Sequence, residues 1–223
     1  MKTVLMSGGS SGIGKAIKEL LTCKGYAVFN IGRREADIIC DLQDVHTLER
    51  EVKGWLKSHE VDVLINCAGV GLFDPHESIS PLAIKKLIDV NLAAPIVLSS
   101  LCLRSLQKTS GHIINITSIE ATRHAKYSAL YTATKSGLRD FGHCLFEEVR
   151  KSGVKVTSIN PDMTQTPFFD ALHFAPSEDE MCYLLPESVA GSVWDILHIK
   201  GVVTDLTLRP QKVGISKKPT KPL

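Results

Sequence analysis

The chain has 223 residues, of which 43% are hydrophobic and 22% charged, and its formal net charge is +2. This composition indicates one large globular domain and excludes a disordered or fibrous chain. Residues 212–223 contain four lysines and no acid, so the rest of the chain holds two more acidic than basic residues. A nucleic-acid-binding face is therefore not expected, and residues 212–223 are expected to form a basic flexible tail.

Neither a membrane segment nor a metal site is expected. The longest run without a charged residue covers residues 90–103 and includes Asn91 and Pro95, so it is too short and too polar to span a bilayer. The apolar stretch before Gly8 is too short for a signal peptide. The six cysteines include no CxxC pair and have no histidines near them at ligand spacing. We expect a cytoplasmic protein without metal or disulfides.

Apolar runs alternate with helical patterns along the chain. In chain order, strands are predicted at residues 3–7, 27–31, 37–40, 61–67, 112–117, 154–160 and 203–208. Helices are predicted between them, from the glycines after the first strand up to residue 25, around 48–56, and at 81–108, 128–151 and 187–199. Because the strands carry no alternating polar face, they predict a parallel sheet buried on both sides. The expected fold is a doubly wound α/β sheet of about seven strands, Rossmann-like, in one domain over residues 1–211.

A glycine-rich loop, "SGGSSGIG", follows the first strand and opens the first helix. Gly8, Gly12 and Gly14 permit a tight turn and let the backbone approach a pyrophosphate, whose charge is favoured at a helix N-terminus. The spacing differs from GxGxxG, and no GK[ST] follows, which excludes a P-loop. Such a turn between strand and helix can also be purely structural.

The loop resembles the TGxxxGIG motif of the short-chain dehydrogenase/reductase family, with Ser7 in place of threonine. Further motifs follow in that family's order over residues 3 to about 170. They are "NCAG" for NNAG, "VN" at the family's active-site asparagine, "INITSIEA" at its catalytic serine, and "YTATK" for YxxxK. The chain resembles the short, single-domain branch of this family. The resemblance implies a domain that binds NAD(P) and transfers a hydride.

The YxxxK pair is Tyr131 and Lys135. Because they are four residues apart, both side chains lie on one face of the predicted helix. A free tyrosine has a pKa of about 10 and is a poor proton donor near neutral pH. A cation at 4 Å contributes about 4 kcal/mol at an effective dielectric of 20, so Lys135 is expected to lower the Tyr131 pKa, partly offset by burial. The same spacing also arises by chance on solvated helices.

By resemblance, Tyr131 exchanges a proton with the substrate and Ser118, 13 residues earlier, hydrogen-bonds the substrate oxygen. Lys135 would hold the nicotinamide ribose, and Asn91 would position a water in a proton relay. The cofactor contacts implied, besides Tyr131 and Lys135, are Gly8, Ser10, Ser11, Gly12, Ile13, Gly14, Arg33, Arg34, Asp41, Leu42, Asn66, Ala68, Gly69, Pro161 and Thr166.

The residues at the end of the second strand predict which nicotinamide cofactor is preferred. Gly32 stands where NAD-preferring relatives carry an acid, and Arg33 and Arg34 follow. A guanidinium forms charge-assisted bonds with a 2′-phosphate, so NADP(H) is expected to be preferred over NAD(H). The alternative is that both arginines are surface charges.

One departure from the family lies in "NPDMTQTP", which resembles its NPGxxxT segment. Asp162 replaces the glycine. If the backbone there has a positive φ, the aspartate would be strained, and its charge could disturb nicotinamide binding. This leaves open a non-catalytic NADP(H)-binding regulatory protein on the same fold.

The substrate region is expected at residues 167–186, where the family has its lid. Phe168, Phe169, Leu172 and Phe174 could line a small apolar pocket or belong to the core. Glu120 and His124 are candidate substrate contacts, or solvated loop charges.

The expected function is an NADP(H)-dependent oxidoreductase that acts on a carbonyl or secondary alcohol of a small substrate. By resemblance, it forms a homodimer or homotetramer through the helix at 81–108 and the helix that carries Tyr131. An epimerase or dehydratase of the family's extended branch would need a larger C-terminal region than the about 15 residues that follow the last strand.

Overall fold

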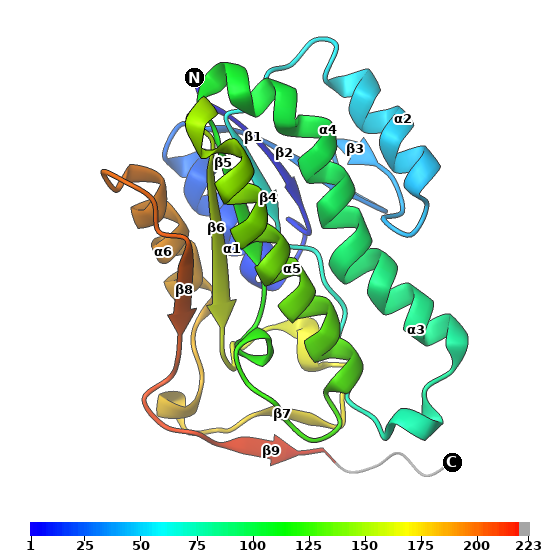
Figure 1. Cartoon of the computed structure of the whole chain (residues 1–223). Coiled ribbons are helices and arrows are strands. Elements are labelled where there is room, and N and C mark those ends of the chain that lie inside the picture. Colours follow the sequence, from blue (N-terminus) through cyan, green and yellow to red (C-terminus); the bar gives the residue numbers. More distant parts are fainter. Residues whose placement is uncertain (219–223) are drawn as a thin grey trace.

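The computed structural model describes residues 1–218; residues 219–223, the end of the expected tail, lie outside the described part. A seven-stranded sheet forms the centre of the molecule (Figure 1), with strands in the order β3-β2-β1-β4-β5-β6-β8 and every neighbouring pair parallel. The strands are β1 (Thr3–Ser7), β2 (Ala27–Gly32), β3 (Ile38–Ile39), β4 (Val63–Asn66), β5 (His112–Ile116), β6 (Lys155–Pro161) and β8 (Asp205–Leu208). The doubly wound fold predicted from the sequence is confirmed.

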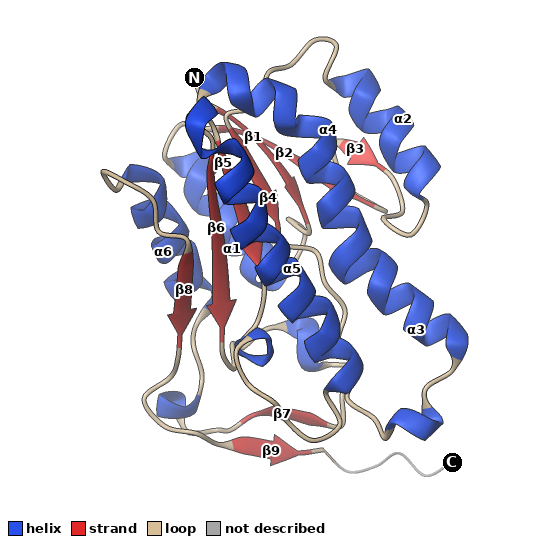
Figure 2. Ribbon diagram, viewed as in Figure 1, coloured by secondary structure: helices blue, strands red, loops and turns tan. Residues whose placement is uncertain are grey.

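Helices cover both faces of the sheet (Figure 2). The α-helices are α1 (Gly12–Cys23), α2 (Val45–Trp55), α3 (Pro81–Ile88), α4 (Ala94–Thr109), α5 (Ala129–Val149) and α6 (Pro186–His198). Single turns of 3₁₀-helix lie at η1 (His76–Ser78), η3 (Ile119–Ala121), η4 (Arg150–Ser152), η5 (Pro167–Phe169) and η6 (Glu180–Cys182). One apolar cluster joins the sheet to α2, α4 and α5, and a second joins it to α1 and α6. The strands are therefore buried from both sides, which explains their lack of polar alternation.

The helix predicted at 81–108 is interrupted. A π-helical segment, η2 (Asp89–Ala93), separates α3 from α4 and carries Asn91. The run Pro81–Thr109 is long and apolar enough to cross a membrane by length and composition alone. However, Leu98, Cys102 and Leu106 on α4 are fully buried against the sheet. The α4 part of this run is therefore a core helix of the domain.

The C-terminal segment differs from the expected tail. Residues Ile215–Lys217 form β9, which pairs antiparallel with β7 (Phe174–Pro176). The pairing is extended by the Lys218 backbone N–H, which donates to the His173 carbonyl oxygen at 2.9 Å. Lys212 also forms an ion pair with Asp179 at 3.1 Å. The expectation of a free tail is wrong for residues 212–218, because backbone pairing and this ion pair hold them beyond the carboxyl ends of the strands (Figure 1).

The topology fixes where a ligand can bind. β1 pairs with β2 on one side and with β4 on the other, so the order of strands reverses between β1 and β4. In open parallel sheets the ligand crevice lies at this reversal, beyond the carboxyl ends of the strands. The glycine loop follows β1 at this point, and the segment from Cys67 to Gly69 follows β4.

Candidate active site

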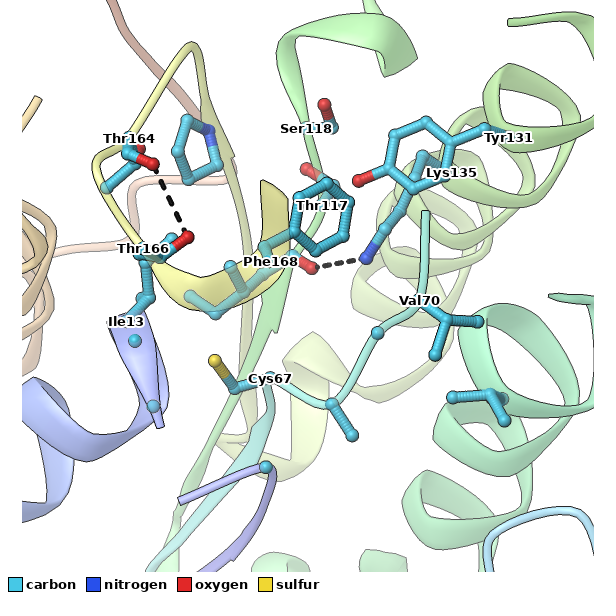
Figure 3. A pocket seen from close by; sticks show the side chains of 18 of the residues that line it. Ile13, Cys67, Val70, Thr117, Ser118, Tyr131, Lys135, Thr164, Thr166 and Phe168 are labelled. Carbon is cyan, nitrogen blue, oxygen red and sulfur yellow. Dashed lines mark hydrogen bonds between the residues drawn. The ribbon is translucent and has the colours of Figure 1, made fainter. Parts of the chain in front are cut away.

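A cleft of about 690 Å³ opens at the reversal of strand order. Its walls come from the loops after β1, β2, β4, β5 and β6, together with the first turns of α1 and α5. Figure 3 shows that Ser118, Tyr131 and Lys135 lie at one part of this pocket and Ile13 and Thr166 at another. The predicted site residues that line it are Gly8, Ser10, Ser11, Gly12, Ile13, Gly14, Arg33, Asp41, Leu42, Ala68, Gly69, Ser118, Tyr131, Lys135, Pro161 and Thr166.

The glycine loop has no room for a side chain at Gly8 or Gly14. Gly8 has φ +79°, and a Cβ there would lie 2.6 Å from the Ala68 nitrogen. A Cβ on Gly14 would lie 2.0 Å from the Gly8 carbonyl oxygen. These glycines are required because the loop folds back on itself beside the segment that follows β4.

The loop and the start of α1 fit the pyrophosphate of a dinucleotide. Ser11 precedes α1 without a side-chain capping hydrogen bond, and the first turn of the helix contains no acid. The first amide groups of a helix have no partner within it, so they favour an anion bound close to the backbone. The glycine loop lets such an anion approach these amides.

Tyr131 and Lys135 are both buried and face the cleft from one side of α5. The Lys135 ammonium donates to the Ile116 carbonyl oxygen at 3.0 Å. It lies over the face of the Tyr131 ring, 5.9 Å from the ring centre. The pair is therefore not a solvated surface pair. Figure 3 shows the two side chains beside one another, and the bond to Ile116 places them at the carboxyl end of β5.

Burial dominates the titration of this pair. It raises the pKa of Tyr131 well above its ordinary value, and the smaller effects of the Ser118 hydroxyl, which lowers the pKa, and of the Glu120 charge, which raises it, leave this direction unchanged. Burial also lowers the pKa of Lys135 to about 8. The expectation that Lys135 lowers the Tyr131 pKa is not met in this structure. At neutral pH the Tyr131 phenol keeps its proton.

Ser118 lies at the end of β5, immediately before η3. Its Oγ accepts a hydrogen bond from the Glu120 backbone N–H at 3.2 Å, and its hydroxyl hydrogen-bonds the Tyr131 side chain, which is how it lowers the pKa of that phenol. Thr117, which precedes it, donates its hydroxyl to the Ile159 carbonyl oxygen on β6 at 2.7 Å. Ser118 is therefore the hydroxyl of this pair that can donate to a ligand.

Three predicted residues do not line the cleft. Asn91 donates to the Val70 carbonyl oxygen and accepts from the Val70 N–H, both at 2.9 Å, so it holds the loop after β4. Asn66 points into the protein, where its amide donates to Asn115 at 2.9 Å. Arg34 is exposed outside the cleft. A Cβ on Gly69 would lie 3.6 Å from Asn91 Oδ1 and 3.3 Å from Lys135 Nζ, so Asn91 and Lys135 still flank the same segment.

Asp162 is not strained, because it does not have a positive φ. One carboxylate oxygen accepts from the Met163 N–H at 2.9 Å, and the other accepts from Arg209 at 3.1 Å. Arg123 lies 3.9 Å away on the other side. The two arginines balance the charge that the sequence places in the NPGxxxT segment, so the aspartate is accommodated there.

An aromatic wall covers Tyr131. The ring centre of Phe73 lies 4.9 Å from the ring centre of Tyr131, and the ring centre of Phe168 lies 6.1 Å from it. Phe174 packs edge-on against Phe73 at 5.2 Å. Phe168, Phe169 and Phe174 line the cleft, as one of the two interpretations of residues 167–186 predicts, whereas Leu172 does not.

Sequence reasoning missed Phe73 and Ile215, which also line this part of the cleft. Phe73 follows the NCAG segment closely enough to be considered as a wall residue. Ile215 reaches the cleft only because β9 pairs with β7, which no local pattern indicates.

Cys67, which replaces an asparagine of the family motif, also lines the cleft. Burial raises the pKa of its thiol to about 12. Because the thiolate is the nucleophile, this residue is not a reactive cysteine.

Comparison with known proteins places this arrangement in a family. Residues 36–175 match the sequence profile of the short chain dehydrogenases. An uncharacterised oxidoreductase of Staphylococcus saprophyticus is 35% identical over 186 residues, which cover 74% of this chain and 80% of the relative. Another, from Staphylococcus epidermidis, is 28% identical over 94% of this chain and 97% of its own length. The chain therefore belongs to the short-chain dehydrogenase/reductase family, and it is an oxidoreductase of that family.

Solved structures agree with this assignment. An alcohol dehydrogenase from the archaeon Thermococcus sibiricus, complexed with 5-hydroxy-NADP, is 25% identical and superposes with a TM-score of 0.85, over 96% of this chain and 99% of that one. Serine dehydrogenase from Escherichia coli is 22% identical, with a TM-score of 0.78 over 93% and 97% of the two chains, and shares the fold.

Proposed function

We propose that the protein is an NADP(H)-dependent oxidoreductase that transfers a hydride between a nicotinamide and a carbonyl or secondary alcohol of a small substrate. The observation that carries the proposal is the meeting of Ser118, Tyr131 and Lys135 in one cleft that continues to the glycine loop. A bound nicotinamide would supply or accept the hydride, and the residues of this chain would bind the substrate and move the proton.

In the reduction of a carbonyl, Tyr131 would act as the proton donor. Tyr131 keeps its proton at neutral pH, so its hydroxyl can donate to the substrate oxygen as negative charge develops there. The Ser118 hydroxyl, next to the Tyr131 phenol, would donate to the same oxygen. Lys135 uses one N–H on the Ile116 carbonyl oxygen and has others for the ribose of the cofactor.

The glycine loop and the start of α1 would hold the pyrophosphate, and Asp41 and Leu42 would contact the adenine. Arg33 lines the cleft after β2, beside Gly32, whereas Arg34 lies outside it. A guanidinium at this place favours a 2′-phosphate. We therefore assign the preference for NADP(H) over NAD(H) to Arg33 rather than to both arginines.

The test measures NADPH and NADH binding by quenching of protein fluorescence, and turnover by the loss of reduced-nicotinamide absorbance with a panel of ketones and aldehydes. We expect tighter binding of NADPH, loss of this preference in Arg33→Ala, and its retention in the neighbouring control Arg34→Ala. Tighter binding of NADH by the wild type would contradict the cofactor assignment. NADPH binding without turnover of any carbonyl would support the alternative, a non-catalytic NADP(H)-binding regulatory protein.

We further propose a cytoplasmic homodimer or homotetramer that assembles through the segment from α3 to α4 and through α5, because members of the family commonly form oligomers. Light scattering on the purified protein tests the assembly, and a monomeric mass would contradict it.

A further inference from the structure

Glu120 lies at the substrate end of the cleft and has no role in the chemistry proposed above. It is in η3, two residues after Ser118, and its backbone N–H donates to the Ser118 hydroxyl at 3.2 Å. Its side chain is only 7% exposed, and the residue lines the cleft. Glu120 is therefore a buried carboxylate next to the hydroxyl that we propose binds the reacting oxygen.

Only one oxygen of the Glu120 carboxylate is paired. Oε1 accepts from two nitrogens of Arg123, Nε at 2.8 Å and Nη2 at 2.7 Å. Oε2 is buried and has no hydrogen-bond partner among residues 1–218. A buried carboxylate oxygen without a donor is unfavourable, so a ligand that supplies a donor there gains free energy of binding.

This unpaired oxygen is distinctive within the described part of the chain. The other buried side-chain atoms without a partner belong to residues that do not line the cleft, namely Asn66, Asn115, His143 and Ser158. Asp41 and Asp162 also line the cleft, but both oxygens of each carboxylate have partners. Among the described carboxylates of the cleft, Glu120 is thus the one with a buried oxygen left for a ligand.

The wall of Phe73, Phe168 and Phe174 around Tyr131 gives the same cleft an apolar part. Aromatic rings of a ligand pack favourably against such a wall. The cleft therefore combines an acceptor beside Ser118 with an apolar surface beside Tyr131.

We propose that Glu120 selects the substrate, by accepting a hydrogen bond from a hydroxyl or ammonium group close to the reacting carbonyl. This inference rests on the proposed function and names its substrate class as hydroxy- or amino-substituted ketones and aldehydes that carry an aromatic or apolar group. Glu120 is a specificity residue: it binds a part of the substrate that does not react.

The test compares acetophenone, 2-hydroxyacetophenone and 2-methoxyacetophenone as substrates with NADPH. The hydroxyl compound carries a donor, and the methoxy compound offers a similar substituent without one. We expect the wild type to prefer the hydroxyl over the methoxy compound in kcat/KM by about tenfold or more, as is typical of a buried hydrogen bond to a charged group. Glu120→Ala is expected to remove this preference and Glu120→Gln to reduce it. Asp170→Asn, at an exposed carboxylate that does not line the cleft, is the control and is expected to retain it.

A structural role of Glu120 would lower the turnover of all three ketones together and leave their ratio unchanged, which would overturn the inference. Equal kcat/KM for the hydroxyl and methoxy compounds in the wild type would also overturn it, while turnover of both would leave the proposed function intact. If none of the three ketones turns over, their binding in the presence of NADP⁺ is measured by saturation-transfer NMR. Preferential binding of the hydroxyl compound, lost in Glu120→Ala, supports the inference, and equal or undetectable binding overturns it.

Discussion

The Lys135 ammonium lies over the face of the Tyr131 ring and donates its hydrogen bond to the Ile116 carbonyl oxygen, not to the phenol. Burial then decides how both groups titrate, because it raises the pKa of Tyr131 and lowers that of Lys135 to about 8. The free protein therefore holds a neutral phenol, ready to donate a proton, beside a lysine whose charge depends on pH. A neutral phenol is the form that the proposed reduction of a carbonyl requires.

The first prediction concerns pH. A lysine with its pKa lowered to about 8 is charged below pH 8 and loses its proton as the pH rises through that value. We expect kcat/KM for NADPH, which reports the free enzyme, to fall above pH 8. Lys135→Arg keeps its charge and is expected to extend the plateau toward higher pH, even with a lower maximum rate. A profile that stays flat to pH 10 in the wild type would contradict this role of Lys135.

The second prediction concerns Asn91. Its replacement by alanine leaves the N–H and C=O of Val70 without their side-chain partner, at a cost of about 1–3 kcal/mol for each group that stays buried. We expect a lower free energy of unfolding in urea and weaker NADPH binding, because the loop after β4 lines the cleft. Ser78→Ala, at an exposed hydroxyl on η1, is the control and should change neither. Unchanged stability and NADPH affinity in Asn91→Ala would argue against this clamp.

The third prediction concerns the glycine loop. In Gly14→Ala the new methyl group would lie 2.0 Å from the Gly8 carbonyl oxygen, so the loop must shift. We expect NADPH affinity to fall at least tenfold. Gly54→Ala in α2, where the new methyl group meets nothing within 4 Å, should leave affinity unchanged and can raise stability by up to about 1 kcal/mol. Equal NADPH affinities of the two variants would rule out the loop as the pyrophosphate site.

The fourth prediction concerns the C-terminal strand. Truncation after residue 211 removes β9 and with it Ile215 from the wall of the cleft. We expect larger ketones to gain in kcat/KM relative to small ones. Ile215→Ala should show the same trend, and Val213→Ala, at an exposed neighbour, should not. A truncated protein with unchanged size selectivity would show that β9 does not limit the substrate.

The sequence predicts the fold and most of the site because both follow from patterns between residues that are close along the chain. The alternation of strands and helices fixes the sheet, and the spacing of Ser118, Tyr131 and Lys135 brings them together once the sheet forms. It does not predict the direction of the Tyr131 pKa, because spacing gives adjacency on a helix but not depth of burial.

Long-range contacts account for the other differences. β9 consists of three residues in a lysine-rich segment, and its order comes from pairing with β7, which is distant in the sequence. Asn66 and Arg34 match family positions, but their side chains lie away from the cleft. Asp162 departs from the family motif, and its partner Arg209 lies 47 residues further along the chain.

The most direct test of the proposed function is the rate of hydride transfer in Tyr131→Phe, measured in a single turnover with NADPH and 2-hydroxyacetophenone or whichever carbonyl the panel identifies. Tyr127→Phe, at an exposed tyrosine that lines the cleft but does not contact Lys135, is the control. We predict that Tyr131→Phe binds NADPH as the wild type does but loses at least a hundredfold in rate, in the range typical of general acid catalysis, about 10²–10⁴. A rate within a few-fold of the wild type would contradict the assignment of Tyr131 as the proton donor.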